Sequence, residues 1–252
     1  NVNVALPESL IFTRVIDMPA LSEKELTSAI HWEAEQYVPL PLSQIMLDYQ
    51  VMGRAVGPEG RMQVFLVAAP KSLIAKYQKV IAATGLELVS IETEAAALNR
   101  ALIDPSPTAP VTILVSIGAE RTNVFVAKGT VIMLTYVIPT GGKALTRALA
   151  TDLGIDPMQA EEYKKTYGLE REALSGKIGN TVKPLLDNLI SELKRTMSFY
   201  QTRNAQAEPI RLIVIVGGSA RLPGLVVYLA ESLGIEAQIG DPWQKVADKK
   251  VL

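Results

Sequence analysis

The pattern of hydrophobic and polar residues changes near residue 104, and it predicts different arrangements on either side. Up to that point the elements follow the order β-α-β-β-α-β-α, and the first five predict a small α+β unit. Ser22 and Glu25 have the spacing of a capping box at the start of the first helix. The expected strands are Leu10–Asp17, Ile45–Met52, Met62–Ala69 and Leu86–Ile91, with a turn at residues 57–60. The expected helices run from Ser22 to Pro39, from Ser72 to Ala83 and from Glu92 to Ile103.

Residues 104–110 include Pro105, Pro107 and Pro110, which indicates a linker. Beyond it, tight connections join three strands and therefore predict antiparallel pairing. These strands are Val111–Ser116, Thr122–Ala127 and Thr130–Ile138. The helices expected next are Lys143–Leu153, Pro157–Tyr167 and Thr181–Thr202, with Pro184 in the first turn of the last one. A buried strand at Leu212–Val216, a helix at Pro223–Leu233 and a short strand at Glu236–Ile239 complete the pattern.

Composition narrows the classes of function. The 252 residues include 25 Lys and Arg and 26 Asp and Glu, for a net charge of −1, with one His and no Cys. A balanced charge argues against a dedicated nucleic-acid binder. The absence of Cys excludes disulfides and thiolate sites, and one histidine cannot form a multi-histidine metal site, so we expect no metal site made by His or Cys. His31 is expected to be an ordinary helix residue.

The apolar runs are the length of strands and fall far short of the ~20 residues of a membrane-spanning helix. We therefore expect no direct membrane insertion. The first residues lack the basic and apolar regions of a signal peptide, and they also lack an initiator Met. We expect the sequence to be a piece of a longer protein.

Three glycine-containing turns are candidates for a nucleotide site. Two of them, Val115–Asn123 and Ile215–Gly224, follow buried strands, and Gly141–Gly142 precedes a helix. Small residues at such turns let a ligand approach free backbone N–H groups, which attract anions. The alternative is that each glycine only permits a tight turn. Neither a P-loop nor a GxGxxG fingerprint is present.

The order of these motifs resembles the actin-like ATPase superfamily. Within it, the sequence is most similar to the PilM family of type IV pilus assembly, which is related to the division protein FtsA. The segments that carry the resemblance are Ala29–Leu42, Leu47–Val51, Ser116–Asn123, Ala160–Gly168, Gly217–Leu225 and Asp241–Trp243. The resemblance implies two α/β lobes of ribonuclease-H-like type, with an α+β insertion of 1C type in the first lobe.

The resemblance also implies a division into subdomains. Residues 1–9 and 84–110 would be a remnant of subdomain 1A, and residues 10–83 would be subdomain 1C. Residues 111–240 would form the second lobe, which binds nucleotide, and residues 241–252 would begin the return to 1A. Lobe 1A would then be incomplete, because its N-terminal phosphate hairpin and its closing C-terminal helix are not in the sequence.

The family's nucleotide-binding residues can be carried over to matching positions. Those near the phosphates would be Ser116, Gly118, Ala119, Arg121, Thr122, Gly141 and Gly142. Those near ribose and adenine would be Glu161, Lys164, Lys165, Gly217, Gly218, Ser219 and Arg221. The resemblance implies ATP or ADP with Mg²⁺ as the ligand, provided that the N-terminal phosphate motif exists in the longer protein. Without the resemblance, the charges at residues 161–165 would be interpreted as a solvated helix face.

The implied partner is the N-terminal tail of a PilN-like inner-membrane protein, which would dock beside subdomain 1C. Candidate contacts are Trp32, Tyr37, Val38 and Leu40, although Tyr37 also follows the helix's core-facing positions. The protein would be cytoplasmic and peripheral to the inner membrane through this partner. Self-association is left open.

One departure from the superfamily bears on catalysis. Ser116 occupies a position that is usually Asp, and a hydroxyl is a poor replacement for a carboxylate near hydrated Mg²⁺. We therefore expect an adaptor that binds nucleotide without efficient hydrolysis, and we assign no catalytic residue. The alternatives are an active ATPase or kinase of the same fold, and an FtsA-like filament scaffold.

Overall fold

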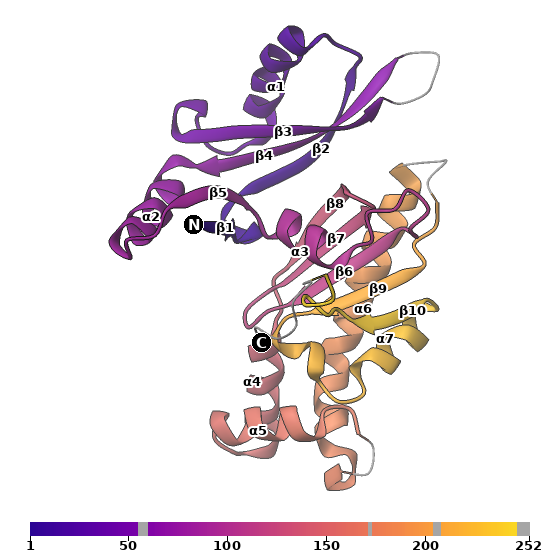
Figure 1. Cartoon of the computed structure of the whole chain (residues 1–252). Helices are drawn as coiled ribbons and strands as arrows, with labels where there is room; N and C mark the ends of the chain where they lie inside the picture. The colour runs from indigo at the N-terminus through magenta and orange to yellow at the C-terminus, as the bar shows by residue number, and fades with distance from the viewer. Residues whose placement is uncertain (55–59, 171–172, 204–207, 246–252) are drawn as a thin grey trace. The chain divides into compact units, whose positions relative to one another are not determined.

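The computed structural model describes residues 1–54, 60–170, 173–203 and 208–245. The chain forms two compact units (Figure 1). The first contains Asn1–Arg100 and Val131–Thr135, and the second contains Ala101–Thr130 and Tyr136–Leu252.

An antiparallel sheet of three strands dominates the first unit. Its strands are β2 (Phe12–Pro19), β3 (Ile45–Arg54) and β4 (Arg61–Pro70), in the order β2-β4-β3. Helix α1 (Glu23–Tyr37) lies against one face of this sheet (Figure 1). Alternate strand residues point to that face and form a core with the apolar side of the helix. The core includes Ile16, Met18, Leu26, Ile30, Ala34, Val38, Ile45, Met62, Val64, Leu66 and Ala68.

A second layer of this unit is built on two parallel strands. These are β1 (Val2–Leu6) and β5 (Leu88–Thr93), which pair with each other. Helix α2 (Lys71–Ala83) packs here, because Ile74 shares a separate small core with Leu6 and Ala69. Helix α3 (Glu94–Leu102) follows β5 directly.

The second unit is organised around a mixed sheet of five strands in the order β10-β9-β6-β7-β8. Strand β6 (Thr112–Ile117) pairs antiparallel with β7 (Thr122–Lys128) and parallel with β9 (Leu212–Val216). The outer strands are β8 (Val131–Ile138), of which Val131–Thr135 are grouped with the first unit, and β10 (Glu236–Ile239). Strand β6 is buried along almost its whole length, as its largely apolar sequence predicts.

Four helices complete the second unit within the described residues. They are α4 (Gly142–Leu153), α5 (Pro157–Tyr167), α6 (Lys177–Arg203) and α7 (Leu225–Leu233). Asp156 caps α5 by accepting hydrogen bonds from the backbone N–H groups of Met158 and Gln159. None of the helices in the described part of the chain is both long and apolar enough to span a bilayer.

Most predicted elements are confirmed, including the capping box of Ser22 and Glu25 and the antiparallel hairpin of β6 and β7. Two differences lie near the start of the chain. Strand β1 was not predicted, and the predicted first strand lies two residues too early, since Leu10 belongs to a short 3-10 helix before β2. Part of the predicted turn at residues 57–60 lies outside the described residues.

The start of α6 was also predicted wrongly. The helix begins at Lys177, so Pro184 lies inside it rather than in its first turn. Proline removes one backbone N–H donor, but the long helix retains buried contacts on both sides of it, through Ile178, Val182, Leu186 and Leu193. The packing of these side chains therefore outweighs the preference of proline for the first turn of a helix.

A buried carboxyl group, that of Glu8 in the short 3-10 helix after β1, connects this helix to α3 and β2. Glu8 is 5% exposed, and its carboxyl group accepts hydrogen bonds from the backbone N–H of Ala95 (3.1 Å) and the hydroxyl of Thr13 (3.3 Å). Burial raises the pKa of Glu8, and this effect outweighs the opposite effect of these hydrogen bonds.

The raised pKa of Glu8 predicts how the stability of the chain varies with pH. Its contribution to the free energy of unfolding should be fully present below its ordinary value of 4.5 and lost as pH rises through the folded pKa. Glu8→Gln cannot titrate, so the free energy of unfolding of the parent chain minus that of the variant should fall above pH 4.5. The slope should reach at most about 1.4 kcal/mol per pH unit. Urea unfolding of both proteins across this range measures it, and a difference that rises with pH would contradict the prediction.

Candidate functional site

The second unit contains a pocket of about 830 Å³ beside the carboxyl ends of β6 and β9. Its walls come from the β6–β7 connection, the first turns of α4, helix α5 and the short 3-10 helix η4 (Gly218–Arg221). Because β6 and β9 are parallel, their carboxyl ends meet at the same edge of the sheet, where α/β proteins commonly bind ligands.

Two glycines allow α4 to approach the β6–β7 connection closely. The backbone N–H of Gly142 donates to the carbonyl of Gly118 (2.8 Å), and that of Lys143 donates to Ala119 (2.9 Å). A Cβ on Gly141 would lie 2.6 Å from backbone atoms of this connection, and one on Gly142 would collide with the hydroxyl of Ser219. The glycine pair is therefore required for the packing of the pocket's own walls.

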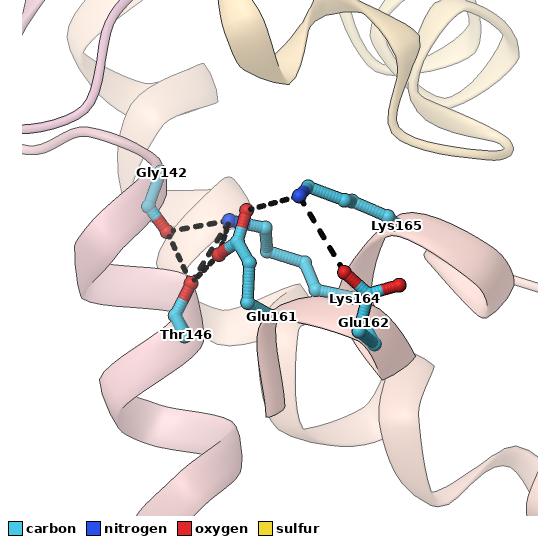
Figure 2. Close-up of polar contacts among 6 residues, drawn as sticks. All are labelled: Gly142, Thr146, Glu161, Glu162, Lys164 and Lys165. Atoms are coloured by element: carbon cyan, nitrogen blue, oxygen red, sulfur yellow. Dashed lines mark hydrogen bonds and ion pairs between the residues drawn. The ribbon is translucent and has the colours of Figure 1, made fainter. Parts of the chain in front are cut away.

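A polar network connects α5 to the first turn of α4 (Figure 2). The Lys164 ammonium group donates to the Gly142 carbonyl (3.1 Å), the Thr146 hydroxyl (2.9 Å) and the Glu161 carboxylate (2.6 Å). The Thr146 hydroxyl is also within hydrogen-bonding distance of Glu161 and of the Gly142 carbonyl. A hydroxyl has one hydrogen, so it donates to one of these two groups at a time.

The network holds Glu161 in its ionised form. Burial raises the pKa of this carboxyl group, but hydrogen bonds from Lys164 and Thr146 and the charges of Lys164 and Lys165 outweigh it. The net result is a pKa of Glu161 below its ordinary value.

The pocket is positively charged overall. Among the described residues that line it, five are basic and Glu161 is the single acidic one. The basic residues are Lys143, Arg147, Lys164, Lys165 and Arg221. This balance favours an anionic ligand.

The first unit contains a different kind of cavity, an apolar groove of about 520 Å³. Alternation along a strand places Met46, Asp48 and Gln50 of β3 on the sheet face opposite α1, and these residues line the groove. Phe65, Val67 and Ala69 of β4 and Leu88–Thr93 of β5 also contribute.

Comparison with known proteins gives the family. The sequence profile described as "Type IV pilus assembly protein PilM" matches residues 1–251. The chain belongs to the PilM family.

Solved structures agree with this assignment. The chain is similar to a PilM–PilN type IV pilus biogenesis complex, with a TM-score of 0.80 and 29% identity, over 99% of this chain and 72% of the other. It is also similar to MreB5 of Spiroplasma citri bound to ADP, with a TM-score of 0.51 and 19% identity, over 73% and 67% of the two chains. The predicted fold class is therefore confirmed as a mixed α/β fold of the actin-like ATPase type.

Curated relatives of this PilM-family chain include two cell division proteins FtsA. The one from Streptococcus pneumoniae is 21% identical over 90% of this chain and 54% of its own length. The one from Enterococcus hirae is 24% identical over 75% of this chain and 47% of its own length. The chain thus spans about half the length of the curated relatives that it matches.

The structure brings most of the predicted nucleotide-binding residues of this PilM-family chain to one pocket. The predicted residues that line it are Gly118, Ala119, Gly142, Glu161, Lys164, Lys165, Gly218, Ser219 and Arg221. The other predicted residues do not line it: these are Ser116, Arg121, Thr122, Gly141 and Gly217.

The residues outside the lining have visible structural roles. The Thr122 side chain is buried, and its hydroxyl donates to the carbonyl of Thr140 (2.7 Å). The Arg121 carbonyl accepts a hydrogen bond from the N–H of Gly118 (2.9 Å) and closes the hairpin. Ser116 lies within β6, in register with Asn123 and Val216.

Sequence reasoning missed the part of the pocket that α4 contributes. Lys143, Thr146 and Arg147 line it, together with Pro157, Met158 and Leu222. Thr146 and Arg147 lie three and four residues after Lys143, which places all three on one side of a helix that begins at Gly142. That periodicity was a signal available in the sequence.

The predicted partner-binding residues lie on or just after α1. Trp32 is 70% exposed and Leu40 is 38% exposed, whereas Val38 is buried in the core. The Tyr37 ring packs against that core and lies 3.8 Å from the guanidinium carbon of Arg14. None of the four is among the described residues that line the groove.

Proposed function

We propose that this chain acts as a nucleotide-binding adaptor in type IV pilus assembly. It binds ATP or ADP in the pocket of the second unit. It binds the extended N-terminal tail of a PilN-like inner-membrane protein in the groove of the first unit. The observation that carries the proposal is the similarity to a PilM–PilN complex over 99% of this chain.

The pocket fits a nucleotide in shape and charge. Four small residues, Gly118, Ala119, Gly142 and Gly218, line its wall, and five basic side chains also line the cavity. Its volume of about 830 Å³ lies within the range of small-molecule sites. A structural relative, MreB5, was solved with ADP.

The same residues support binding better than hydrolysis. Glu161 is the one carboxylate among the described lining residues, and it is already hydrogen-bonded to Lys164 and Thr146. Ser116 supplies no carboxylate for hydrated Mg²⁺. A phosphate-release assay with Mg²⁺ and ATP addresses the alternative of an active ATPase, and sustained turnover would favour that alternative.

The groove suits an extended apolar peptide. Its floor is largely apolar, and two of the strands that line it, β3 and β5, are outer strands among the described sheets. An outer strand offers unpaired backbone N–H and C=O groups to an added strand, while alternate side chains of the peptide enter the groove. Tail docking would hold the protein at the cytoplasmic side of the inner membrane through its partner.

Isothermal titration calorimetry tests both halves of the proposal. We expect ATP and a synthetic peptide of the PilN-like tail to bind the same protein, each at a stoichiometry of one. A protein that binds neither ligand would contradict the proposal. Filaments seen by electron microscopy with ATP and lipid would instead support the FtsA-like scaffold.

A further inference from the structure

Lys164 and Lys165 are neighbours in the sequence and both approach the Glu161 carboxylate, but their side chains differ strongly in burial (Figure 2). The Lys164 side chain is 7% exposed and reaches toward the first turn of α4, whereas the Lys165 side chain is 61% exposed. An ammonium group has three hydrogens, and Lys164 has three acceptors within 3.1 Å. Its donor capacity is therefore used within the protein.

Among the described residues, the ion pairs of Lys165 are long. Its ammonium nitrogen lies 3.7 Å from a Glu161 oxygen and 3.8 Å from a Glu162 oxygen, which are both longer than hydrogen bonds. Exposed pairs of this kind contribute little to stability, and they are exchanged easily for a ligand. Lys165 can therefore turn toward an anion in the pocket without leaving a buried group unpaired.

One acceptor of Lys164, the Gly142 carbonyl, belongs to a closely packed part of the pocket wall. The backbone N–H of Gly142 donates to the Gly118 carbonyl. A Cβ on Gly142 would collide with the Ser219 hydroxyl and would lie 3.5 Å from the Lys164 ammonium nitrogen. One ammonium group thus ties α5 to α4, and through Gly142 to the β6–β7 connection.

We infer that Lys164 is a positioning residue that fixes the Gly142 turn and Glu161, while Lys165 provides the cation that contacts an anionic ligand. This inference rests on the proposed nucleotide binding. It differs from the expectation, based on family resemblance, that Lys164 itself contacts ribose or adenine.

The test compares Lys164→Met with Lys165→Met in the full chain, using ATP and adenosine as probes in calorimetry. Lys164→Met removes the positioning residue and alters the wall of the pocket. It should therefore weaken the binding of both ligands by the same factor, about tenfold or more. Lys165→Met should weaken the binding of ATP and leave the affinity for adenosine unchanged. If Lys164→Met weakened the binding of ATP but not that of adenosine, the inference would be overturned.

A second variant separates positioning from a general loss of folding. Lys164→Met leaves the partly buried Glu161 charge without its main partner, and Lys164→Met/Glu161→Gln removes that charge as well. We expect the double variant to bind adenosine more tightly than Lys164→Met does. An affinity for adenosine that is no better in the double variant would contradict the inference.

A measurement without ligand distinguishes failure of this inference from failure of the proposed function. The amide hydrogens of Gly142 and Lys143 are bonded to the carbonyls of Gly118 and Ala119, so their exchange reports on the turn. Exchange should be faster in Lys164→Met and unchanged in Lys165→Met, even if the parent chain bound no nucleotide. Equal exchange in both variants would reject the positioning role.

Discussion

Gly217→Ala is expected to lower the free energy of unfolding by on the order of 3 kcal/mol. Gly217 follows β9 and has a φ of +88° with a ψ of 174°, a backbone conformation that is essentially restricted to glycine. A Cβ there would also collide with the carbonyl oxygen of Ile117, at the end of the neighbouring strand β6. Backbone atoms at the end of a buried strand cannot move aside, so both penalties should apply. Urea unfolding followed by circular dichroism measures the loss.

Two other glycines provide matched controls for this prediction. Gly154 also has a positive φ of +64°, but a Cβ there would meet nothing within 4 Å. Gly154→Ala should therefore cost only about 1 kcal/mol, the cost of the backbone conformation alone. A Cβ on Gly218 also meets nothing within 4 Å, and no positive φ is found there, so Gly218→Ala should leave stability nearly unchanged. Equal losses in all three variants would show that the close approach of Gly217 to Ile117 is unimportant.

The sequence predicted the fold better than the details of the sites because the two depend on different information. Local patterns such as the alternation in β3 and the proline at the start of α5 are enough to place elements. The orientation of Lys164 and Lys165 depends on which side of α5 faces α4, and the charge pattern alone does not contain that information. The same sequence is compatible with a solvated helix face.

The groove illustrates a signal that was present but not used. Strand β4 is apolar on both faces: Val64 and Leu66 face α1, while Phe65 and Val67 face the groove. An antiparallel strand with apolar residues on both faces is expected to be covered on both sides. The predicted partner contacts, Trp32 among them, lie on or just after α1, and that helix covers the opposite face of the sheet.

Met46→Glu/Val89→Glu should reduce binding of the PilN-like tail peptide at least about tenfold, which corresponds to ~1.4 kcal/mol. Met46 is 54% exposed on β3 and Val89 is 59% exposed on β5, so neither side chain is needed for a buried core. A docked peptide would remove both new carboxylates from water without giving them a partner, and this desolvation opposes binding. Titration calorimetry with the tail peptide measures the change, and ATP affinity should remain the same because the nucleotide pocket belongs to the other unit.

Val80→Glu is the matched control, because Val80 lies on α2 in the same unit, is 64% exposed and is not among the described residues that line the groove. It adds one negative charge, where the double variant adds two, and it should leave peptide affinity unchanged. A general effect of negative charge would weaken peptide binding in both proteins. Trp32→Ala distinguishes the two surfaces. If the tail docks on α1, this variant should lose binding and Met46→Glu/Val89→Glu should retain it. If the tail docks in the groove, as we propose, the results should be reversed, since the three-stranded sheet separates Trp32 from the groove.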